Sequence, residues 1–235
     1  MLPAKLWPVS FQPVVPEELR MTGEPKAPGA PAIILFREVN RDDRGGTAHE
    51  DVYFRIKILT EEGRKYADIE IPFLKDSGKI VGIHARTIKP DGTIVDFTGK
   101  AFDKSIVKAR GLKYMAKTFT MPDVQVGSIL EYYYTEDLAE YLIFDSHWIL
   151  SHELFTKKAS FSLKPYPNFY LQWNWHMLPA GTQQPASGSN GVITLVANDI
   201  PAFQTEDYMP PENEMKSRVD FVYSEYSFER DPDKY

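Results

Sequence analysis

The residues best suited to metal binding or proton transfer are five histidines, and their spacing favours neither role. No two of them form an H-E-x-x-H or H-x-H pair, the patterns that aim two imidazoles at one metal ion. His147 and His152 are five residues apart, so on a single strand they would point to opposite faces. We expect no metal site and no cofactor, and structural or surface roles for His49, His84, His147, His152 and His176.

Nucleophilic hydrolysis is also poorly supported. Asp145, Ser146 and His147 are the residue types of a hydrolase triad, but triad groups converge from separate elements and these three are adjacent. The chain has no G-x-S-x-G elbow and no cysteine, which excludes a thiolate nucleophile and any disulfide. We expect no amidase, protease or acyl-transfer activity from this chain. A hydrolase that draws His and acid residues from separate strands is the weakest alternative.

Pairs of adjacent acidic residues recur along the chain. Glycosidases need two carboxylates that face each other at ~5–9.5 Å, which neighbours on one strand do not provide. The pairs lie in or beside predicted turns, so solvated loop charge is expected for Asp42-Asp43, Glu50-Asp51, Glu61-Glu62 and Glu136-Asp137.

Aromatic side chains crowd the middle of the chain and suggest either a ligand surface or a core. Residues 169–175 alternate, with Phe169, Leu171, Trp173 and Trp175 on one side, which is typical of a buried strand face. The opposite side carries a polar set that could bind a carbohydrate or peptide or could simply be solvated: Tyr170, Gln172, Asn174 and His176.

The composition limits what can position these residues. The chain has 235 residues, 43% of them hydrophobic, which is enough for a packed core and excludes a fully disordered chain. Its net charge of −6 argues against a nucleic-acid partner, because that affinity comes mostly from Lys and Arg on phosphates. The longest apolar run, residues 32–36, is far below the ~20 residues of a membrane span.

Alternation with period two dominates from Ala32 onward and predicts an all-β fold. About a dozen short strands, bounded by turns such as Pro90-Asp91-Gly92, indicate a large antiparallel β-sandwich. Short helices are expected only at Pro16–Arg20 and near Ala109. The predicted organisation is a Pro-rich extended arm (1–31), a β-sandwich domain (32–228) and an exit linker to a further domain (229–235).

The last predicted strand should also have a face that needs a cover. Phe221 and Tyr223 are expected in the core, so the alternate residues of the same strand point outward and form a partly apolar, exposed face. We expect a partner to pack on that side, although the Pro-rich arm could cover the same surface instead. The residues of this partner face are Val222, Tyr226 and Phe228.

Three stretches resemble the bacterial domain of unknown function 3857. They are TEEGRKYA at residues 60–67, KPDGTIV at 89–95 and MPDVQVGSILEY at 121–132, of which the third is the most specific. The similarity covers roughly residues 19–230.

The resemblance implies a β-rich domain directly before a transglutaminase-like domain of the Cys-His-Asp class, often behind a signal peptide. It therefore implies an extracytoplasmic accessory module whose partner is a transglutaminase- or protease-like domain downstream. Because the chain has no cysteine, no catalytic residue of that class can be placed in it.

Overall fold

The chain is almost entirely β, as its alternating pattern predicts. A computed structural model describes residues 10–45, 47–75, 77–109, 112–138, 145–167, 169–206 and 208–225. These residues form fourteen strands in three sheets and only three short helical segments: α1 (Pro16–Arg20), the 3-10 helix η1 (Glu62–Ala67) and α2 (Glu212–Met215). None of the helices in the described part of the chain is long and apolar enough to cross a bilayer.

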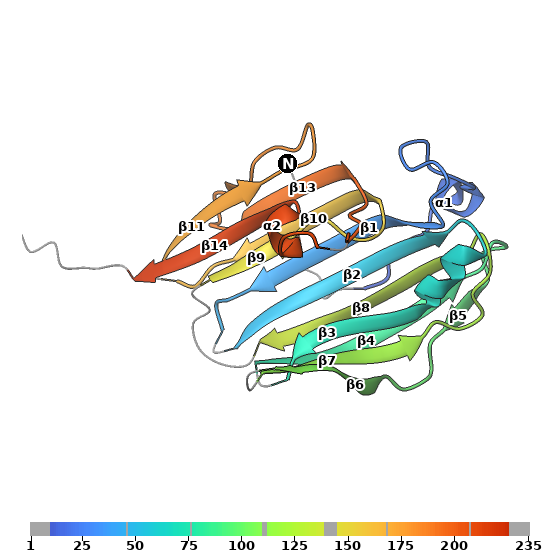
Figure 1. The fold of residues 1–235 in the computed structure, drawn as a ribbon, viewed down its shortest axis with the longest axis horizontal. Coiled ribbons are helices and arrows are strands. Elements are labelled where there is room, and N and C mark those ends of the chain that lie inside the picture. The colour runs from blue at the N-terminus through green and yellow to red at the C-terminus, as the bar shows by residue number, and fades with distance from the viewer. Residues whose placement is uncertain are drawn as a thin grey trace, which may run out of the picture.

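The largest element is an eight-stranded sheet that runs the length of the molecule (Figure 1). We call it the large sheet. Its strands are, in spatial order, β12 (Ala186–Ser187), β13 (Ile193–Ile200), β10 (Thr156–Lys164), β1 (Ala32–Asp42), β2 (Ala48–Ile58), β8 (Ile129–Leu138), β4 (Gly78–Ile88) and β5 (Ile94–Asp96).

Two three-stranded sheets complete the sandwich, one toward each end of the large sheet (Figure 1). Both contribute buried side chains to the main hydrophobic core, Ile69 and Phe119 from one sheet and Val219 and Phe221 from the other. The same core contains Leu130 of the large sheet, so both small sheets cover the same face of it. They are β3–β7–β6, with strands Asp68–Leu74, Leu112–Thr120 and Phe102–Ala109, and β11–β14–β9, with strands Phe169–His176, Arg218–Glu225 and Asp145–Ile149.

The N-terminal arm, described over residues 10–31, lies on the other face of the large sheet. Ile129, which points away from Leu130 on strand β8, belongs to a second buried cluster. Arm residues Val14, Leu19 and Met21 pack against this cluster. Over residues 10–31 the arm therefore covers apolar surface opposite the two small sheets, and this described part does not cover the outer side of β14.

Three details differ from or refine the sequence expectations. β1 and β10 pair in parallel, whereas the other strand pairs are antiparallel. Parallel pairing of β1 and β10 is possible because the long stretch of chain between them brings β10 back to the free edge of β1. The second short helix is not near Ala109, which ends strand β6, but at residues 212–215. The Pro90-Asp91-Gly92 turn does join a hairpin, with Ile88 of β4 opposite Ile94 of β5.

Candidate functional site

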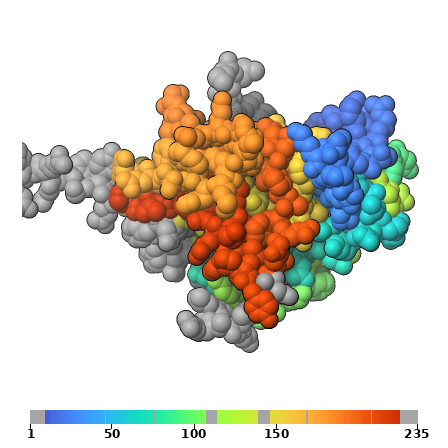
Figure 2. All heavy atoms as spheres, turned by 45° about the horizontal axis from the view of Figure 1, so that its top comes forward, coloured from blue at the N-terminus to red at the C-terminus, as the bar shows by residue number. Residues whose placement is uncertain are grey.

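The candidate site is the side of the β11–β14–β9 sheet that points away from the large sheet, here called the outer face. β11 and β14 pair antiparallel over their whole lengths, with Gln172 opposite Val222 and Asn174 opposite Asp220. Figure 2 shows residues 169–217, orange to red-orange, gathered on one face of the molecule, with the blue arm beside them at one edge. Strands almost fifty residues apart in the sequence thus share one surface.

Strict alternation decides which side chains reach this face. In β14 the side chains of Val219, Phe221 and Tyr223 are buried, while Val222 is 50% exposed. In β11, Leu171 is buried and Tyr170 is 49% exposed. The inward residues are held by the core, because moving the register by one residue would bury polar side chains and expose aromatic ones.

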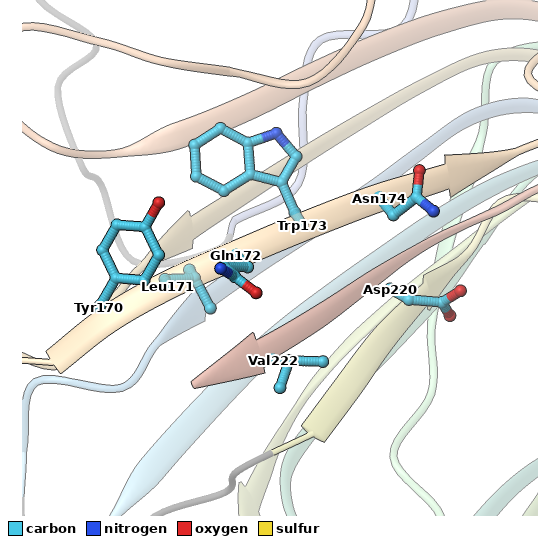
Figure 3. Close-up of a pocket in the computed structure, with 7 residues that line it drawn as sticks. All are labelled: Tyr170, Leu171, Gln172, Trp173, Asn174, Asp220 and Val222. Atoms are coloured by element: carbon cyan, nitrogen blue, oxygen red, sulfur yellow. The ribbon is translucent and has the colours of Figure 1, made fainter. Parts of the chain in front are cut away.

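A shallow cavity of about 460 Å³ lies along the two strands. In Figure 3 the side chains of Gln172 and Val222 lie in its middle, with Tyr170 at one end and Asn174 and Asp220 at the other. Leu171 and Trp173 complete its lining. The cavity therefore combines apolar surface with two side-chain amides.

The two amides differ in whether they already make hydrogen bonds within the protein. The Oδ1 atom of Asn174 accepts a hydrogen bond of 2.8 Å from the backbone N–H of Trp175. Within the described part of the chain, the exposed amide of Gln172 has no hydrogen-bond partner. One complete amide and the NH₂ group of another are therefore available to a ligand.

The charged groups of the outer face are paired with one another at one end. The Oδ2 atom of Asp220 lies 3.0 Å from His176 Nε2 and 3.0 Å from Arg218 Nε. Arg218 also donates a hydrogen bond to the carbonyl of Asn213. The middle of the cavity, between Gln172 and Val222, carries no charge of its own.

The described residues of the two predicted sets share one surface. Tyr170, Gln172, Asn174 and His176 lie on the outer side of β11, and Val222 lies on the same side of the neighbouring strand. Tyr226 and Phe228 lie outside the described residues. Sequence reasoning identified both strand faces but missed Asp220, whose alternation with Phe221 was the available signal.

The other histidines hold positions that fit structural or surface roles. His49 pairs with Asp137 at 2.8 Å, and the ring of His84 stacks on Tyr133. Burial, together with the nearby positive charge of Arg37, lowers the pKa of His152 to about 4. Across the described ranges, no three His, Cys, Asp or Glu side chains come together as metal ligands would.

Residues 145–147 do not form a triad. Ser146 is opposite the buried Phe221 and His147 is opposite the outward Asp220, so the two side chains leave opposite faces of β9. A serine cannot pass its proton to a histidine on the far side of its own strand.

The expectation that the paired acids are solvated loop charges is wrong for three of them. Asp43 is fully buried, where it accepts hydrogen bonds from Arg41 at 2.7 Å and from the Tyr223 hydroxyl at 2.8 Å. Glu50 and Glu136 are cross-strand partners on β2 and β8. Burial raises the pKa of both carboxyls, that of Glu136 to about 7.

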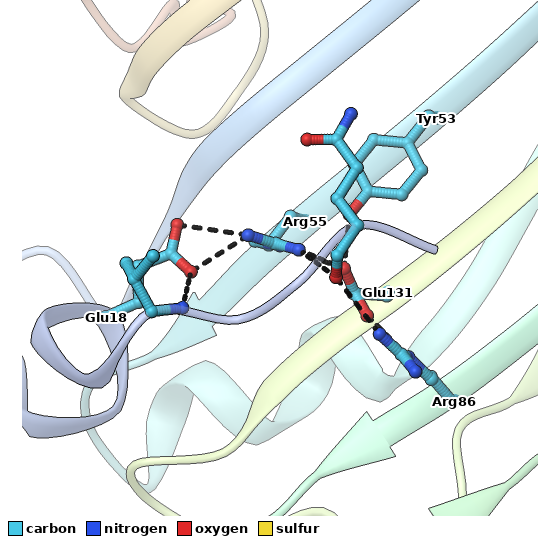
Figure 4. Close-up of polar contacts among 7 residues, drawn as sticks. Glu18, Tyr53, Arg55, Arg86 and Glu131 are labelled. Atoms are coloured by element: carbon cyan, nitrogen blue, oxygen red, sulfur yellow. Dashed lines mark hydrogen bonds and ion pairs between the residues drawn. The ribbon is translucent and has the colours of Figure 1, made fainter. Parts of the chain in front are cut away.

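A second polar cluster, which sequence reasoning missed, fastens the arm to the large sheet (Figure 4). Glu131 is fully buried and accepts hydrogen bonds from Tyr53, Arg55 and Arg86. Arg55 is also 2.9 Å from the carboxylate of Glu18 in α1. Because its members are buried or half-buried and satisfy one another, this cluster is a structural anchor.

The same anchor accounts for the most specific sequence motif, residues 121–132. Glu131 belongs to it, and Gly127, whose φ of 88° favours glycine, offers its carbonyl oxygen to Lys57 Nζ at 2.6 Å. Ser128 is fully buried, and its hydroxyl oxygen accepts a hydrogen bond from the Gln125 N–H. The motif thus builds a turn and an ion-pair network.

Comparison with known proteins identifies the family. The model of DUF3857, described as a domain of unknown function with a solved structure, matches residues 45–204. The chain belongs to this family. No curated protein matches it.

Solved structures support the same fold. A structure described as a "putative protease" from Parabacteroides distasonis aligns with a TM-score of 0.61 at 15% identity, over 82% of this chain and 40% of that one. The chain therefore spans well under half the length of that protein. A nutrient-binding protein from Legionella pneumophila, likewise described as putative, aligns with a TM-score of 0.39 at 9% identity, over 82% of this chain and 67% of that one. Leukotriene A4 hydrolase from Saccharomyces cerevisiae aligns with a TM-score of 0.41 at 9% identity, over 82% of this chain and 29% of that one. The last two alignments are too loose to establish a shared fold.

Proposed function

We propose that the chain is a non-catalytic accessory module of a longer extracytoplasmic protein, and that it packs against or positions substrate for a transglutaminase- or protease-like domain. The observation that carries the proposal is the Parabacteroides structure. There the same fold makes up 40% of a chain described as a "putative protease", so the larger part of that protein lies outside the β module.

The outer face is the surface of this chain that best suits such a role. Val222 and Tyr170 are about half exposed there, beside a cavity of about 460 Å³. The strand that carries Val222, β14, is also the last strand of the described residues. Inter-domain contacts within one chain typically bury ~600–1,500 Å², and leaving apolar surface in water costs ~25 cal/mol per Å².

The proposal is tested by comparing this chain with the longer natural protein. Hydroxyl-radical footprinting should show that the oxidation of Tyr170 falls several-fold when the further domain is present. Tyr114 of β7, which is 44% exposed on a different sheet, is the matched control and should react equally in both proteins. Equal oxidation of Tyr170 in the two proteins would contradict the proposal.

The absence of catalysis is tested separately. The chain alone should not turn over generic peptide, amide or ester substrates, because it has no thiol and no converging nucleophile and base. Turnover that survives purification and is abolished by His147→Ala or His176→Ala would overturn this part.

The alternative function is a stand-alone binding module for a peptide or glycan. The observation that favours it is the polar lining of the same cavity by Gln172, Asn174 and Asp220. In that case the outer face would bind its ligand in the isolated chain and would remain as exposed in the longer protein.

A further inference from the structure

The outer face presents its ligand-binding groups at a regular spacing. Tyr170, Gln172 and Asn174 are alternate residues of one strand, so their Cα atoms follow one another at about 6.8 Å. Val222 and Asp220 form a second row on β14, directly opposite Gln172 and Asn174. The two rows line a straight, shallow trough.

An extended polypeptide has the same repeat. In a β conformation every second residue points the same way, so its side chains also recur at about 6.8 Å. A segment lying along β11 would therefore meet each position of the row with an equivalent group. The Gln172 amide can both donate to and accept from peptide groups, which are themselves amides, and the NH₂ group of Asn174 can donate to them.

The charge and polarity of the trough limit further which ligands it can bind. Asp220, Arg218 and His176 pair with one another at one end of the trough. The middle holds only the Gln172 amide and the methyl groups of Val222, so a charged group placed there would be desolvated without a partner. The ligand must be uncharged at that point.

The aromatic side chains favour a peptide over a glycan. A sugar-binding surface needs aromatic faces exposed for stacking, and Trp173 and Trp175 instead pack against the core. The indole N–H of Trp173 is already bonded to the carbonyl of Pro185 at 3.2 Å. This leaves Tyr170, about half exposed, as the most exposed of the described aromatic residues of the trough.

We infer that the outer face binds a polypeptide segment in an extended conformation, with its uncharged middle over Gln172 and Val222 and its axis along β11. This deepens the proposed function by naming the substrate class that the module would position. The segment lies on the face of the sheet; at the free edge of β11 the Asn174 side chain already occupies the Trp175 N–H.

The test uses the chain by itself and an NMR titration of its side-chain amides. The probe is a nonapeptide of alternating serine and valine, acetylated and amidated at its ends, and the comparison probe is a chitin hexasaccharide. The peptide should shift the NH₂ signals of Gln172 and Asn174 in a saturable way, and the hexasaccharide should not. Signals unmoved by millimolar peptide, or moved by the hexasaccharide alone, would overturn the inference.

Variants then assign the binding to the trough. Gln172→Ala removes the unpaired amide and should weaken peptide binding about tenfold, the effect of losing one or two hydrogen bonds. Gln204→Ala changes an exposed amide outside the trough and should bind as the unaltered chain does. Equal affinity of Gln172→Ala and Gln204→Ala, with both variants folded, would contradict the assignment.

The two proposals fail differently. Footprinting of the longer protein tests whether the outer face meets a further domain or its substrate, whereas the titration needs neither. Peptide binding without protection of Tyr170 would retain the inference and reject the accessory role. Protection of Tyr170 without peptide binding would retain the accessory role and reject the peptide.

Discussion

At the residue scale, the ion pair between Arg55 and Glu18 decides how firmly the arm is held. Arg55 is buried between Glu131 of the sheet and Glu18 of the arm, so losing one partner leaves part of a buried cation uncompensated. Glu18→Ala should therefore lower the free energy of unfolding by about 1–3 kcal/mol.

The neighbouring acid provides a matched control for this prediction. Glu17 also lies in α1, but its ion pair with Arg20 is about three-quarters exposed, and such pairs contribute at most ~1 kcal/mol. In urea denaturation Glu17→Ala should stay within about 0.5 kcal/mol of the unaltered chain. Equal losses in the two variants would show that the arm is not held by Arg55.

The half-buried carboxyl of Glu136 should make stability depend on pH. Burial raises its pKa from an ordinary 4.5 to about 7, so the folded chain holds this proton more tightly than the unfolded chain does. The stability from that proton is fully present below about pH 4.5 and is lost as the pH rises through 7. Each pKa unit corresponds to ~1.4 kcal/mol, so the loss is up to about 3 kcal/mol.

Glu136→Gln keeps the shape of the side chain and cannot ionise, which tests this linkage. Its free energy of unfolding should exceed that of the unaltered chain by about 1–3 kcal/mol at pH 8, and the two should agree at pH 4. Glu62→Gln, at an exposed position of η1, should follow the unaltered chain at both values. A Glu136→Gln variant with no advantage at pH 8 would refute the linkage.

At the element scale, successive residues of strand β14 point alternately into the core and onto the outer face. Phe221 is 1% exposed and its ring contacts Trp148 edge to face, with centroids 4.6 Å apart, so Phe221→Ala should cost about 3–5 kcal/mol. Val222→Ala, one residue further, should change stability by no more than about 0.5 kcal/mol in this chain. Thermal or urea denaturation measures both, and a large loss from Val222→Ala would mean that the outer face is already covered.

At the scale of the whole molecule, the structural unit is larger than the segment that the family model matches. Residues 45–204 omit β1, which lies between β10 and β2, and β14, the middle strand of its sheet. Without β1 the large sheet is cut into two parts, and without β14 the outer face does not exist. A fragment of residues 45–204 should therefore fail to fold cooperatively.

A fragment of residues 10–225 is the control, because it keeps the arm and both strands. It should show one sharp urea transition by tryptophan fluorescence and well-dispersed amide proton signals, whereas the shorter fragment should show neither. A cooperative transition in residues 45–204 would mean that β1 and β14 are dispensable.

The alternating sequence by itself determined the local geometry of this protein. Phe169, Leu171 and Trp173 face inward and Tyr170 and Gln172 outward because side chains on a strand alternate, and this needs no knowledge of the neighbouring strand. The all-β class, the hairpin around Asp91 and the short helix that begins at Pro16 follow from similarly local rules.

Only the tertiary structure decided which strands are neighbours. Alternation says that Gln172 and Val222 are both exposed, but their pairing depends on contacts between residues far apart in the chain, which no local pattern encodes. The same reason explains the misjudged acids. Both Asp43 and Glu136 lie near turns, where acidic residues are usually solvated. Asp43 nevertheless accepts a hydrogen bond from the Tyr223 hydroxyl, and Glu136 lies opposite Glu50 of the neighbouring strand β2. Whether a residue is buried depends on which distant parts of the chain pack over it, so burial is determined only when the sheets pack together.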